Sequence, residues 1–564
     1  MEGFGVKYAS EPSFSLITKK LHSQHVSPDG QCQGVQAKIQ MKTDKTNPVT
    51  LTTIFKQFPL KVLAGDPGDT QITDIAMDNR LVQPGNLFVA MKGGSADGHD
   101  FIPDAIQRGA AAVVGDKAMS GLPVPYIQVE NSRQALSWLA AAFYGNPGHK
   151  LTVIGVTGTD GKTTTCNLLY QILLAAGLKA GLISTVNAVI GDEVLDTGFH
   201  VTTPDAPDVQ RFLARMVAAG LTYAILETTS HGWAQYRVEA CEFDVGVITN
   251  ITHEHLDQHG SYENYRTAKA RLFQSLEKTL PKPQGNPRLS VLNRDDSSYE
   301  TLSRIAPRPQ VCYGLDVAAD IRADSINYSP QGIHFDAVGM DFRVPVTSPL
   351  VGEFNVSNCL AALAAAICGL GIDPKIAVRG IAAMPGIPGR MERIDLGQPF
   401  TAIVDFAHTP NALRVAIETV RRMTEKRVIV IFGSAGLRDR EKRRMLTEVA
   451  AELADVSILT AEDPRTELLD GILEEMSVGA CSKGGVEEKT FWRVPDRGEA
   501  IRFGVQMATA GDIVMSCGKG HEQSMCFDTT EYPWDDRIAM RAALSELTGV
   551  TGPQMPYLPT QGEK

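Results

Sequence analysis

The sequence lacks the features that mark membrane-spanning and secreted proteins. It contains no run of 18 apolar residues for a membrane span, and its N-terminus has no basic-then-apolar secretory signal. The nine cysteines are scattered from Cys32 to Cys526 without a C-x-x-C pair, which argues against zinc or dithiol chemistry. These absences together indicate a protein of the reducing cytoplasm with no membrane span.

The sequence also lacks the basic excess of a general nucleic-acid-binding protein. Its 54 Lys and Arg are outnumbered by 65 Asp and Glu, which gives a formal net charge of -11. Binding to a phosphate backbone needs clustered basic residues, so we expect no nucleic-acid partner. Any acidic substrate must therefore meet local basic sites.

Regular periodicity is missing at the N-terminus as well. Residues 1–50 are polar and mixed, which favours a disordered extension, or translated upstream sequence if Met41 is the true start. An organellar transit peptide is the alternative, and Glu2, Glu11 and Asp29 weigh against it. A chain of 564 residues with 43% hydrophobic content should form about three or four domains.

What is present after residue 50 is an alternation of short apolar runs and helical patterns. This alternation predicts an α/β protein with mostly parallel, doubly wound sheets. The predicted strands include 86–90, 112–114, 151–156, 223–226, 245–248, 400–404, 427–432, 456–460 and 512–516. The pattern divides the chain into an N-terminal domain at 51–147, a central P-loop-type domain at 148–392, a Rossmann-like C-terminal domain at 393–548 and a tail at 549–564.

A glycine-rich loop joins the strand predicted at 151–156 to a helix predicted at 163–175. The backbone N–H groups at such a helix N-terminus bind phosphate oxygens. Lys162 can reach the terminal phosphates, and the Thr163 hydroxyl is placed to bind Mg²⁺. The loop departs from the full Walker A pattern because Val156 stands where that pattern has glycine, and a chance turn with a solvated lysine is the alternative. Its residues are Gly158, Thr159, Asp160, Gly161, Lys162, Thr163 and Thr164.

Two further strands end in polar residues rather than in plain turns. Glu227 follows the run at 223–226, where its carboxylate could hold Mg²⁺ or merely cap the next helix. The run at 245–248 leads into residues 249–260, where three of the twelve histidines fall within seven residues. Clustered His and acidic residues suggest metal or phosphate binding, although one of these histidines could equally be a structural hydrogen bonder.

The next predicted helix, at 262–273, places Tyr265, Lys269 and Phe273 at i, i+4 spacing. On this spacing alone, Lys269 is interpreted as a solvated lysine.

Three strands of the C-terminal domain are followed by charged loops. Ligands collect at the carboxyl ends of parallel strands. Arg438 and Arg465 could clamp a carboxylate, and Glu522 could pair with an amino group, which suits a second amino acid. The alternative is that these residues form surface ion pairs. The three loops are 436–439, 462–465 and 518–522.

Taken in order, these motifs resemble the Mur ligase family. The resemblance covers nearly everything after residue 70, and so many ordered motifs make coincidence negligible. It implies that the first domain holds the UDP end of the substrate, the middle domain ATP and the last domain the incoming amino acid. Besides the glycine-rich loop, the motifs that carry it lie at 78–80, 84–90, 97–101, 202–205, 230–232, 255–257, 354–356, 389–392, 405–410 and 518–522.

The reaction that the resemblance implies is ATP-dependent amide formation in peptidoglycan precursor biosynthesis. ATP phosphorylates the D-Glu γ-carboxylate of UDP-MurNAc-L-Ala-D-Glu, and the amine of a diamino acid then attacks the acyl phosphate. The expected cofactors are ATP and Mg²⁺, and the expected state is a monomer.

Residue by residue, the resemblance assigns a role to each matching position. Lys269 takes the position of a carbamylated lysine, which replaces its interpretation as a solvated lysine. Carbamylation is the reaction of the neutral lysine amine with CO2. The catalytic positions are Lys162, His255 and Lys269, and the metal ligands are Thr163, Glu227, His255 and carbamylated Lys269. The ATP positions are Gly158, Thr159, Asp160, Gly161, Lys162, Thr163, Thr164, Asn355 and His408. The UDP-substrate positions are of two kinds: those that face the UDP part are Asn79, Gly94, Ser95 and Ala96, and those that face the muramoyl dipeptide are Thr202, Thr203, Ser230, Gln235 and Arg237. The amino-acid positions are Arg438, Glu462, Asp463, Pro464, Arg465, Gly518 and Glu522.

The sequence departs from the family at two places. Glu462 and Asp463 replace the Asp-Asn of the diaminopimelate pattern, and the added negative charge could favour lysine or ornithine. Arg465 argues the other way, so diaminopimelate is favoured over lysine and ornithine. Asn79 replaces the usual serine near the nucleotide base.

Two alternative functions follow from the same motifs. One is a related ligase for another acid, against which the segments at 202–205 and 463–465 speak. The other is a catalytically silent organellar assembly protein with the same fold, which the intact Lys162, Glu227, His255 and Lys269 disfavour.

Overall fold

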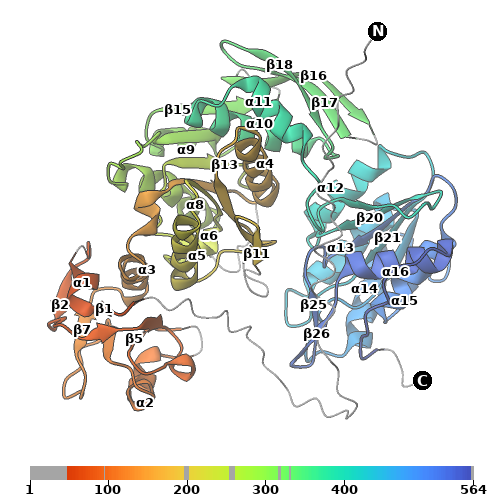
Figure 1. Ribbon diagram of the computed structural model, residues 1–564. Coiled ribbons are helices and arrows are strands. Elements are labelled where there is room, and N and C mark those ends of the chain that lie inside the picture. The colour runs from red at the N-terminus through yellow and green to blue at the C-terminus, as the bar shows by residue number, and fades with distance from the viewer. Residues whose placement is uncertain are drawn as a thin grey trace, which may run out of the picture. The chain divides into compact units, whose positions relative to one another are not determined.

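The computed structural model describes residues 47–56, 58–93, 96–195, 202–252, 261–315, 319–329 and 332–560. Within them, three large sheets with helices on their faces follow one another along the chain (Figure 1). This is the three-domain α/β fold with mostly parallel sheets that the alternation of strands and helices predicted.

The first sheet has the strand order β2-β7-β6-β5-β4. It is parallel from β7 to β4, and β2 pairs antiparallel at the edge. Apolar clusters cover both faces, which explains why β5 and β6 consist of buried residues. The strands of this sheet are β2 (Val62–Ala64), β4 (Asp74–Ala76), β5 (Asn86–Val89), β6 (Ala112–Gly115) and β7 (Tyr126–Val129). A separate two-stranded sheet consists of β1 (Val49–Thr50) and β3 (Gln71–Ile72), and the helices are α1 (Leu51–Phe55), α2 (Ile102–Gln107) and α3 (Ser132–Phe143).

The second sheet places the strand of the glycine-rich loop between the two strands that end in polar residues. Its order is β11-β10-β9-β12-β8-β13-β14-β15-β16-β17-β18, and it is parallel from β9 to β16. Its strands are β8 (Thr152–Thr157), β9 (Ala180–Ile183), β10 (Ala188–Ile190), β11 (Glu193–Leu195), β12 (Tyr223–Glu227), β13 (Val245–Ile248), β14 (Leu289–Asn293), β15 (Gln310–Gly314), β16 (Ile321–Ser329), β17 (Gly332–Val338) and β18 (Arg343–Ser348).

Helices cover both faces of this sheet. Ile154 and Val156 of β8 belong to one apolar cluster with α4, α10 and α11. Gly155 points to the opposite face, where a side chain would meet Leu272 of α8. The helices are α4 (Lys162–Ala175), α5 (Ala206–Ala218), α6 (Ser230–Ala234), α8 (Tyr262–Lys278), α9 (Tyr299–Ile305), α10 (Phe354–Ala364) and α11 (Pro374–Ala382).

The third sheet has the order β19-β20-β24-β21-β22-β23, parallel except at β19. One apolar cluster joins it to α12, α13 and α14, and a second joins its other face to α15 and α16 (Figure 1). The strands of this sheet are β19 (Glu392–Ile394), β20 (Thr401–Asp405), β21 (Val428–Phe432), β22 (Val456–Leu459), β23 (Phe491–Arg493) and β24 (Ile513–Cys517). A separate two-stranded sheet consists of β25 (Ser524–Phe527) and β26 (Thr530–Pro533), and the helices are α12 (Pro410–Arg421), α13 (Glu441–Leu453), α14 (Leu469–Ser482), α15 (Arg497–Met507) and α16 (Asp536–Thr548).

One part of the fold differs from the sequence predictions. The strands β16 to β18 add an antiparallel extension to the second sheet that no predicted strand anticipated. The segment at 549–564, predicted as a tail, includes Leu558, which is fully buried in the core of the third sheet. Most of residues 1–50, predicted as a disordered extension, lie outside the described residues, although β1 at Val49–Thr50 pairs with β3.

Among the helices of the described residues, none combines the length and the apolar character needed to cross a bilayer.

Candidate active site

The glycine-rich loop lies at the carboxyl end of β8, and two of its glycines are required by their surroundings. Gly158 has φ 151 and Gly161 has φ 79. A Cβ on Gly158 would lie 1.8 Å from Thr249 Oγ1, and one on Gly161 would lie 2.2 Å from Asn358 Oδ1. Glycine therefore lets the loop turn tightly and lets neighbouring polar side chains approach its backbone.

The loop is held in place by the end of the neighbouring strand β13. The Asp160 N–H donates to Asn250 Oδ1 at 2.9 Å, and the Thr249 hydroxyl donates to the Asp160 carbonyl at 2.5 Å. The Lys162 ammonium donates to the Thr159 carbonyl at 2.7 Å. These bonds fix the loop before any phosphate arrives, so its N–H groups at the start of α4 are preorganised for an anion. Thr164, the third residue of α4, is buried.

Glu227 ends β12 on the other side of the loop, and it contacts the first turn of α4. Its carboxylate accepts the Thr163 hydroxyl at 3.0 and 2.9 Å, and it also accepts the Thr185 N–H at 3.0 Å. Glu227 is only 2% exposed. It does not cap the next helix, because the Thr229 side chain caps α6. The interpretation of Glu227 as a helix cap is therefore wrong.

The chemistry of this pair suits magnesium. A buried carboxylate and a hydroxyl are hard oxygen ligands of the kind that Mg²⁺ combines with waters and phosphate oxygens. His255, the further predicted ligand, lies outside the described residues. Among the residues that the structure describes, no group of three or more His, Cys, Asp and Glu side chains gathers as a metal site. The described part of the predicted set therefore consists of Thr163, Glu227 and Lys269.

Lys269 lies against the loop and not in solvent. It is 1% exposed, and its ammonium donates to the Gly158 carbonyl at 2.5 Å. It also lies 4.5 Å above the ring of Tyr265, whose hydroxyl is 3.0 Å from Thr159 Oγ1. The solvated lysine that helix spacing favoured is therefore wrong, and α8 contributes two side chains to the loop.

The positions predicted for the muramoyl dipeptide form a hydrogen-bonded group beside Glu227. The Thr229 N–H donates to Thr203 Oγ1 at 3.0 Å, and Arg237 donates to the Thr203 carbonyl at 2.7 Å. Arg237 also donates to Gln235 Oε1 at 2.9 Å. Ser230 begins α6 directly after Thr229. The structure thus brings Thr203, its neighbour Thr202, Ser230, Gln235 and Arg237 together around one loop.

The positions predicted for the UDP end lie in the first domain. Asn79 donates from Nδ2 to Asp104 Oδ2 at 2.7 Å, so its side chain is joined to the start of α2. Ala96 is exposed. Gly94 and Ser95 lie outside the described residues.

The two further positions predicted for the nucleotide differ in what they contact. Asn355 accepts a hydrogen bond from Asn358 at 2.9 Å, and Asn358 lies against Gly161. His408 contacts its own domain: its Nδ1 is 3.0 Å from the Phe406 carbonyl, and the two rings are 4.6 Å apart. Within the described residues, no hydrogen bond joins His408 to the loop. Desolvation, with a further effect of nearby Lys442, lowers the pKa of His408 to about 4.

The loops after β22 and β24 meet through a buried lysine. Lys519, 1% exposed at its side chain, lies 3.0 Å from Asp463 and 2.5 Å from Glu522. Desolvation opposes the charge on Lys519, but its two carboxylate partners hold its pKa above the ordinary value. Glu522, predicted to meet a substrate amino group, thus already contacts a protein cation.

Glu462 is a buried acid of this site, and one of its two carboxylate oxygens, Oε2, accepts no hydrogen bond from the described residues. Burial raises the pKa of the Glu462 carboxyl, although Lys442 opposes the shift. A Cβ on Gly518 would lie 2.2 Å from this oxygen, so glycine there keeps the space beside it open.

Arg438 and Arg465 do not form the surface ion pairs of the alternative interpretation. Within the described residues neither has a salt bridge, and Arg438 is exposed. Arg465 Nη1 lies 3.5 Å from the Gly436 carbonyl, which places it at the loop of Arg438. Pro464, which precedes Arg465 in the chain, also lies against the loop of Arg438, since a Cβ on Gly436 would lie 2.0 Å from the Pro464 carbonyl.

Sequence reasoning missed several residues that shape these sites. Four residues within or beside the motifs were assigned no function from the sequence: Thr249, Asn250, Asn358 and Lys519. The position of Thr249 and Asn250 directly after β13 was a usable signal, because strand ends flank the loop. Nothing in the sequence pairs Lys519 with Asp463.

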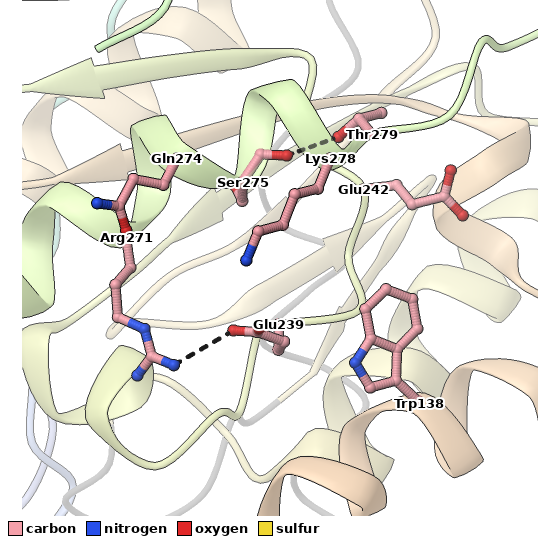
Figure 2. Close-up of a pocket in the computed structure, with 8 residues that line it drawn as sticks. All are labelled: Trp138, Glu239, Glu242, Arg271, Gln274, Ser275, Lys278 and Thr279. Atoms are coloured by element: carbon pink, nitrogen blue, oxygen red, sulfur yellow. Dashed lines mark hydrogen bonds and ion pairs between the residues drawn. The ribbon is translucent and has the colours of Figure 1, made fainter. Parts of the chain in front are cut away.

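A separate pocket lies between α3 and the C-terminal half of α8. Figure 2 shows Trp138 facing Glu239 and Arg271, with Lys278 above them. The pocket has a volume of about 40 Å³, which suffices for a few waters but not for a nucleotide. None of the predicted site residues lines it.

Comparison with known proteins gives matches along most of the chain. Residues 71–144 match the Mur ligase family catalytic domain, 156–366 the Mur ligase middle domain and 389–520 the Mur ligase glutamate ligase domain. The chain is 43% identical over 489 residues to a UDP-N-acetylmuramyl-tripeptide synthetase from Roseiflexus sp. (strain RS-1), with 85% of this chain and 96% of the relative covered.

Two further similar proteins carry a more specific description. The chain is 40% identical over 479 residues to a UDP-N-acetylmuramoyl-L-alanyl-D-glutamate--2,6-diaminopimelate ligase from Geobacillus thermodenitrificans (strain NG80-2), with 85% and 96% of the two chains covered. A solved structure of a ligase with the same description superposes with a TM-score of 0.62 and 30% identity, and the match covers 89% of this chain and 100% of that one.

Proposed function

The chain belongs to the Mur ligase family of ATP-dependent amide ligases, and we propose that it joins meso-diaminopimelate to the D-Glu γ-carboxylate of UDP-MurNAc-L-Ala-D-Glu. Its similarity to tripeptide synthetases and diaminopimelate ligases makes it a MurE-type ligase of peptidoglycan precursor synthesis. The observation that carries the proposal is the nucleotide loop flanked by buried Glu227 and Lys269.

We propose that the reaction proceeds through an acyl phosphate. A γ-carboxylate oxygen attacks the γ-phosphorus of ATP, and ADP leaves. The amine nitrogen then attacks the activated carbonyl carbon, and the tetrahedral intermediate collapses with loss of phosphate and of the amine proton. Phosphoryl transfer needs positioning and charge neutralisation, which the loop N–H groups and Lys162 supply.

Thr163 and Glu227, with His255 and carbamylated Lys269, would hold Mg²⁺. The ion, when bound, neutralises phosphate charge. Burial of Lys269 supports its carbamylation, because a desolvated lysine more readily gives the neutral amine that reacts with CO2. Asn355 supports the nucleotide through Asn358 at Gly161, and His408 is proposed to contact it from the C-terminal domain.

The substrate would extend from the first domain to this site. Asn79, Gly94, Ser95 and Ala96 are proposed to contact its UDP end. The residues beside Glu227 would bind the dipeptide, because Arg237 among them is held in place by its hydrogen bond to the Thr203 carbonyl. These proposed dipeptide contacts are Thr202, Thr203, Ser230, Gln235 and Arg237.

The contacts of Asp463 support diaminopimelate. The sequence departure at this position adds a negative charge, but Lys519 binds that carboxylate at 3.0 Å and compensates it. Arg438 and Arg465 then remain for a distal carboxylate of the substrate, which diaminopimelate has and lysine and ornithine lack. Glu462, whose Oε2 lacks a donor among the described residues, would take up an ammonium group. The same loops contain three further residues that we propose to lie at the amino-acid site, Pro464, Gly518 and Glu522.

The location and assembly of the enzyme follow from its substrates. ATP and a UDP-linked precursor are cytoplasmic metabolites, and the described cysteines are free thiols, so we propose a cytoplasmic enzyme. We also propose that the enzyme is a monomer.

The test is an ADP-release assay with UDP-MurNAc-L-Ala-D-Glu, ATP and Mg²⁺. Diaminopimelate, lysine and ornithine are supplied separately, and reactions without the amino acid serve as controls. We expect the highest kcat/KM with diaminopimelate. No ADP with any of the three would refute the ligase, whereas a higher value with lysine or ornithine would refute only the choice of amino acid.

A further inference from the structure

A buried arginine joins the two helices that follow the loops of Arg438 and Arg465. Arg443 lies in the first turn of α13, and its side chain is 1% exposed. Its Nη2 donates to both carboxylate oxygens of Glu467 at 2.9 Å, and its Nη1 donates to Glu475 of α14 at 3.0 Å. A buried cation with two carboxylates is a rigid anchor, because breaking either pair leaves charge in a desolvated site.

Glu467 connects this anchor to both amino-acid loops. Its Oε1 accepts the Leu437 N–H, one residue before Arg438. Its own N–H donates to the Pro464 carbonyl at 3.1 Å, one residue before Arg465. The hydrogen bond from the Leu437 N–H is the main reason that the pKa of Glu467 lies below its ordinary value, so the carboxylate is charged at neutral pH.

The loops need such an anchor because their backbone is strained. Leu437, Asp463 and Arg465 have φ of 54, 40 and 53, in the left-handed region that side chains disfavour. Conformations of this kind persist only where surrounding contacts hold them. The Gly436 N–H also donates to the Asp463 carbonyl at 3.0 Å, so the two strained loops are bonded to each other.

We propose that Glu467 and Arg443 are positioning residues that set the affinity for the diamino acid. Glu467 fixes the Leu437 backbone, and this orients Arg438 at the loop that carries Arg465, so that both guanidiniums can bind one substrate carboxylate. Neither residue touches the substrate. This inference rests on the proposed function and adds to it the contacts that shape the amino-acid site.

The test compares steady-state kinetics of the full-length wild type, Glu467→Ala and Glu467→Gln. We expect Glu467→Ala to raise the KM for diaminopimelate by about tenfold or more, with the KM for ATP and for the UDP substrate changed by less than about twofold. Glu467→Gln keeps an acceptor for the Leu437 N–H, so its KM should rise by about threefold only. A purely structural role would instead lower kcat through loss of folded enzyme and leave every KM unchanged.

Glu475→Ala is the matched control, because it removes the other carboxylate from Arg443 but leaves the Leu437 bond. Its thermal midpoint should fall, and its KM for diaminopimelate should stay within about twofold of the wild type. An unchanged KM in Glu467→Ala, a glutamine variant no better than alanine, or an equal rise in Glu475→Ala would each overturn the proposal. A wild type that forms no product contradicts the proposed function itself.

Discussion

Replacing Asp463 with Asn and Lys519 with Met together should leave the choice of amino acid nearly unchanged, because the pair carries no net charge. An uncompensated carboxylate about 6 Å from a substrate carboxylate would disfavour it by about 3 kcal/mol at an effective dielectric of 20, or roughly 100-fold. The buried Lys519 lies 3.0 Å from Asp463 and provides the opposite charge. We therefore expect the kcat/KM ratio of diaminopimelate to lysine to change by less than about threefold in this double variant.

The assay is ADP release with each amino acid at matched concentrations of the other substrates. Asp463→Asn alone removes one charge of the pair and should raise the diaminopimelate-to-lysine ratio by roughly 100-fold. Asp470→Asn, an exposed neutralisation at the start of α14, controls for its change in net charge. Glu462→Gln is the contrasting variant, since its carboxylate has a buried oxygen without a partner in the described residues. It should raise the KM for every diamino acid by at least about tenfold. A shift of the diaminopimelate-to-lysine ratio by about 100-fold in the double variant would refute the compensation by Lys519.

Three further outcomes are expected. Lys269→Ala should lose most activity and partly recover it with added short carboxylates, and unaltered activity in the same assay would exclude a role for the carbamate. Lys519→Met should lower the unfolding free energy in urea by about 3–5 kcal/mol, because it leaves Asp463 and Glu522 without their buried cation, and a loss below about 1 kcal/mol would contradict that pairing. Burial lowers the pKa of His521 to about 3, below the ordinary 6.5, so folding favours the neutral ring. Its stabilising contribution is complete above pH 6.5 and is lost as the pH falls toward 3. His521→Gln should therefore lose less stability than the wild type between pH 6.5 and pH 4 in urea titrations, and identical pH profiles would argue against this shift.

The sequence sufficed for the parts of the fold and site that depend on local chemistry. The alternation of apolar strands and helices predicted the parallel sheets. The glycine-rich loop and Glu227 were predicted as site residues because each follows the end of an apolar strand, β8 and β12 respectively. The proposed contacts with the UDP end stay predictions. The structure describes the surroundings of Asn79 and Ala96 without a bound substrate, and Gly94 and Ser95 lie outside the described residues.

The remaining features depend on contacts between distant residues. The bond between Thr159 and Tyr265 joins residues 106 apart, and the pair of Asp463 and Lys519 joins residues 56 apart. Neither pairing leaves a local pattern in the sequence. The strands β16 to β18 were missed for a different reason, because exposed and buried residues alternate in them without the continuous apolar run that marked the parallel strands.

The central claim is that ATP activates the D-Glu γ-carboxylate as an acyl phosphate before the amide forms. It is tested most directly with UDP-MurNAc-L-Ala-D-Glu labelled with ¹⁸O at both oxygens of that carboxylate, incubated with the full-length chain, ATP, Mg²⁺ and diaminopimelate. Mass spectrometry of the products should find one ¹⁸O in the released phosphate for each amide formed. Amide formation with unlabelled phosphate would contradict the acyl phosphate, and the absence of both amide and ADP would contradict the ligase.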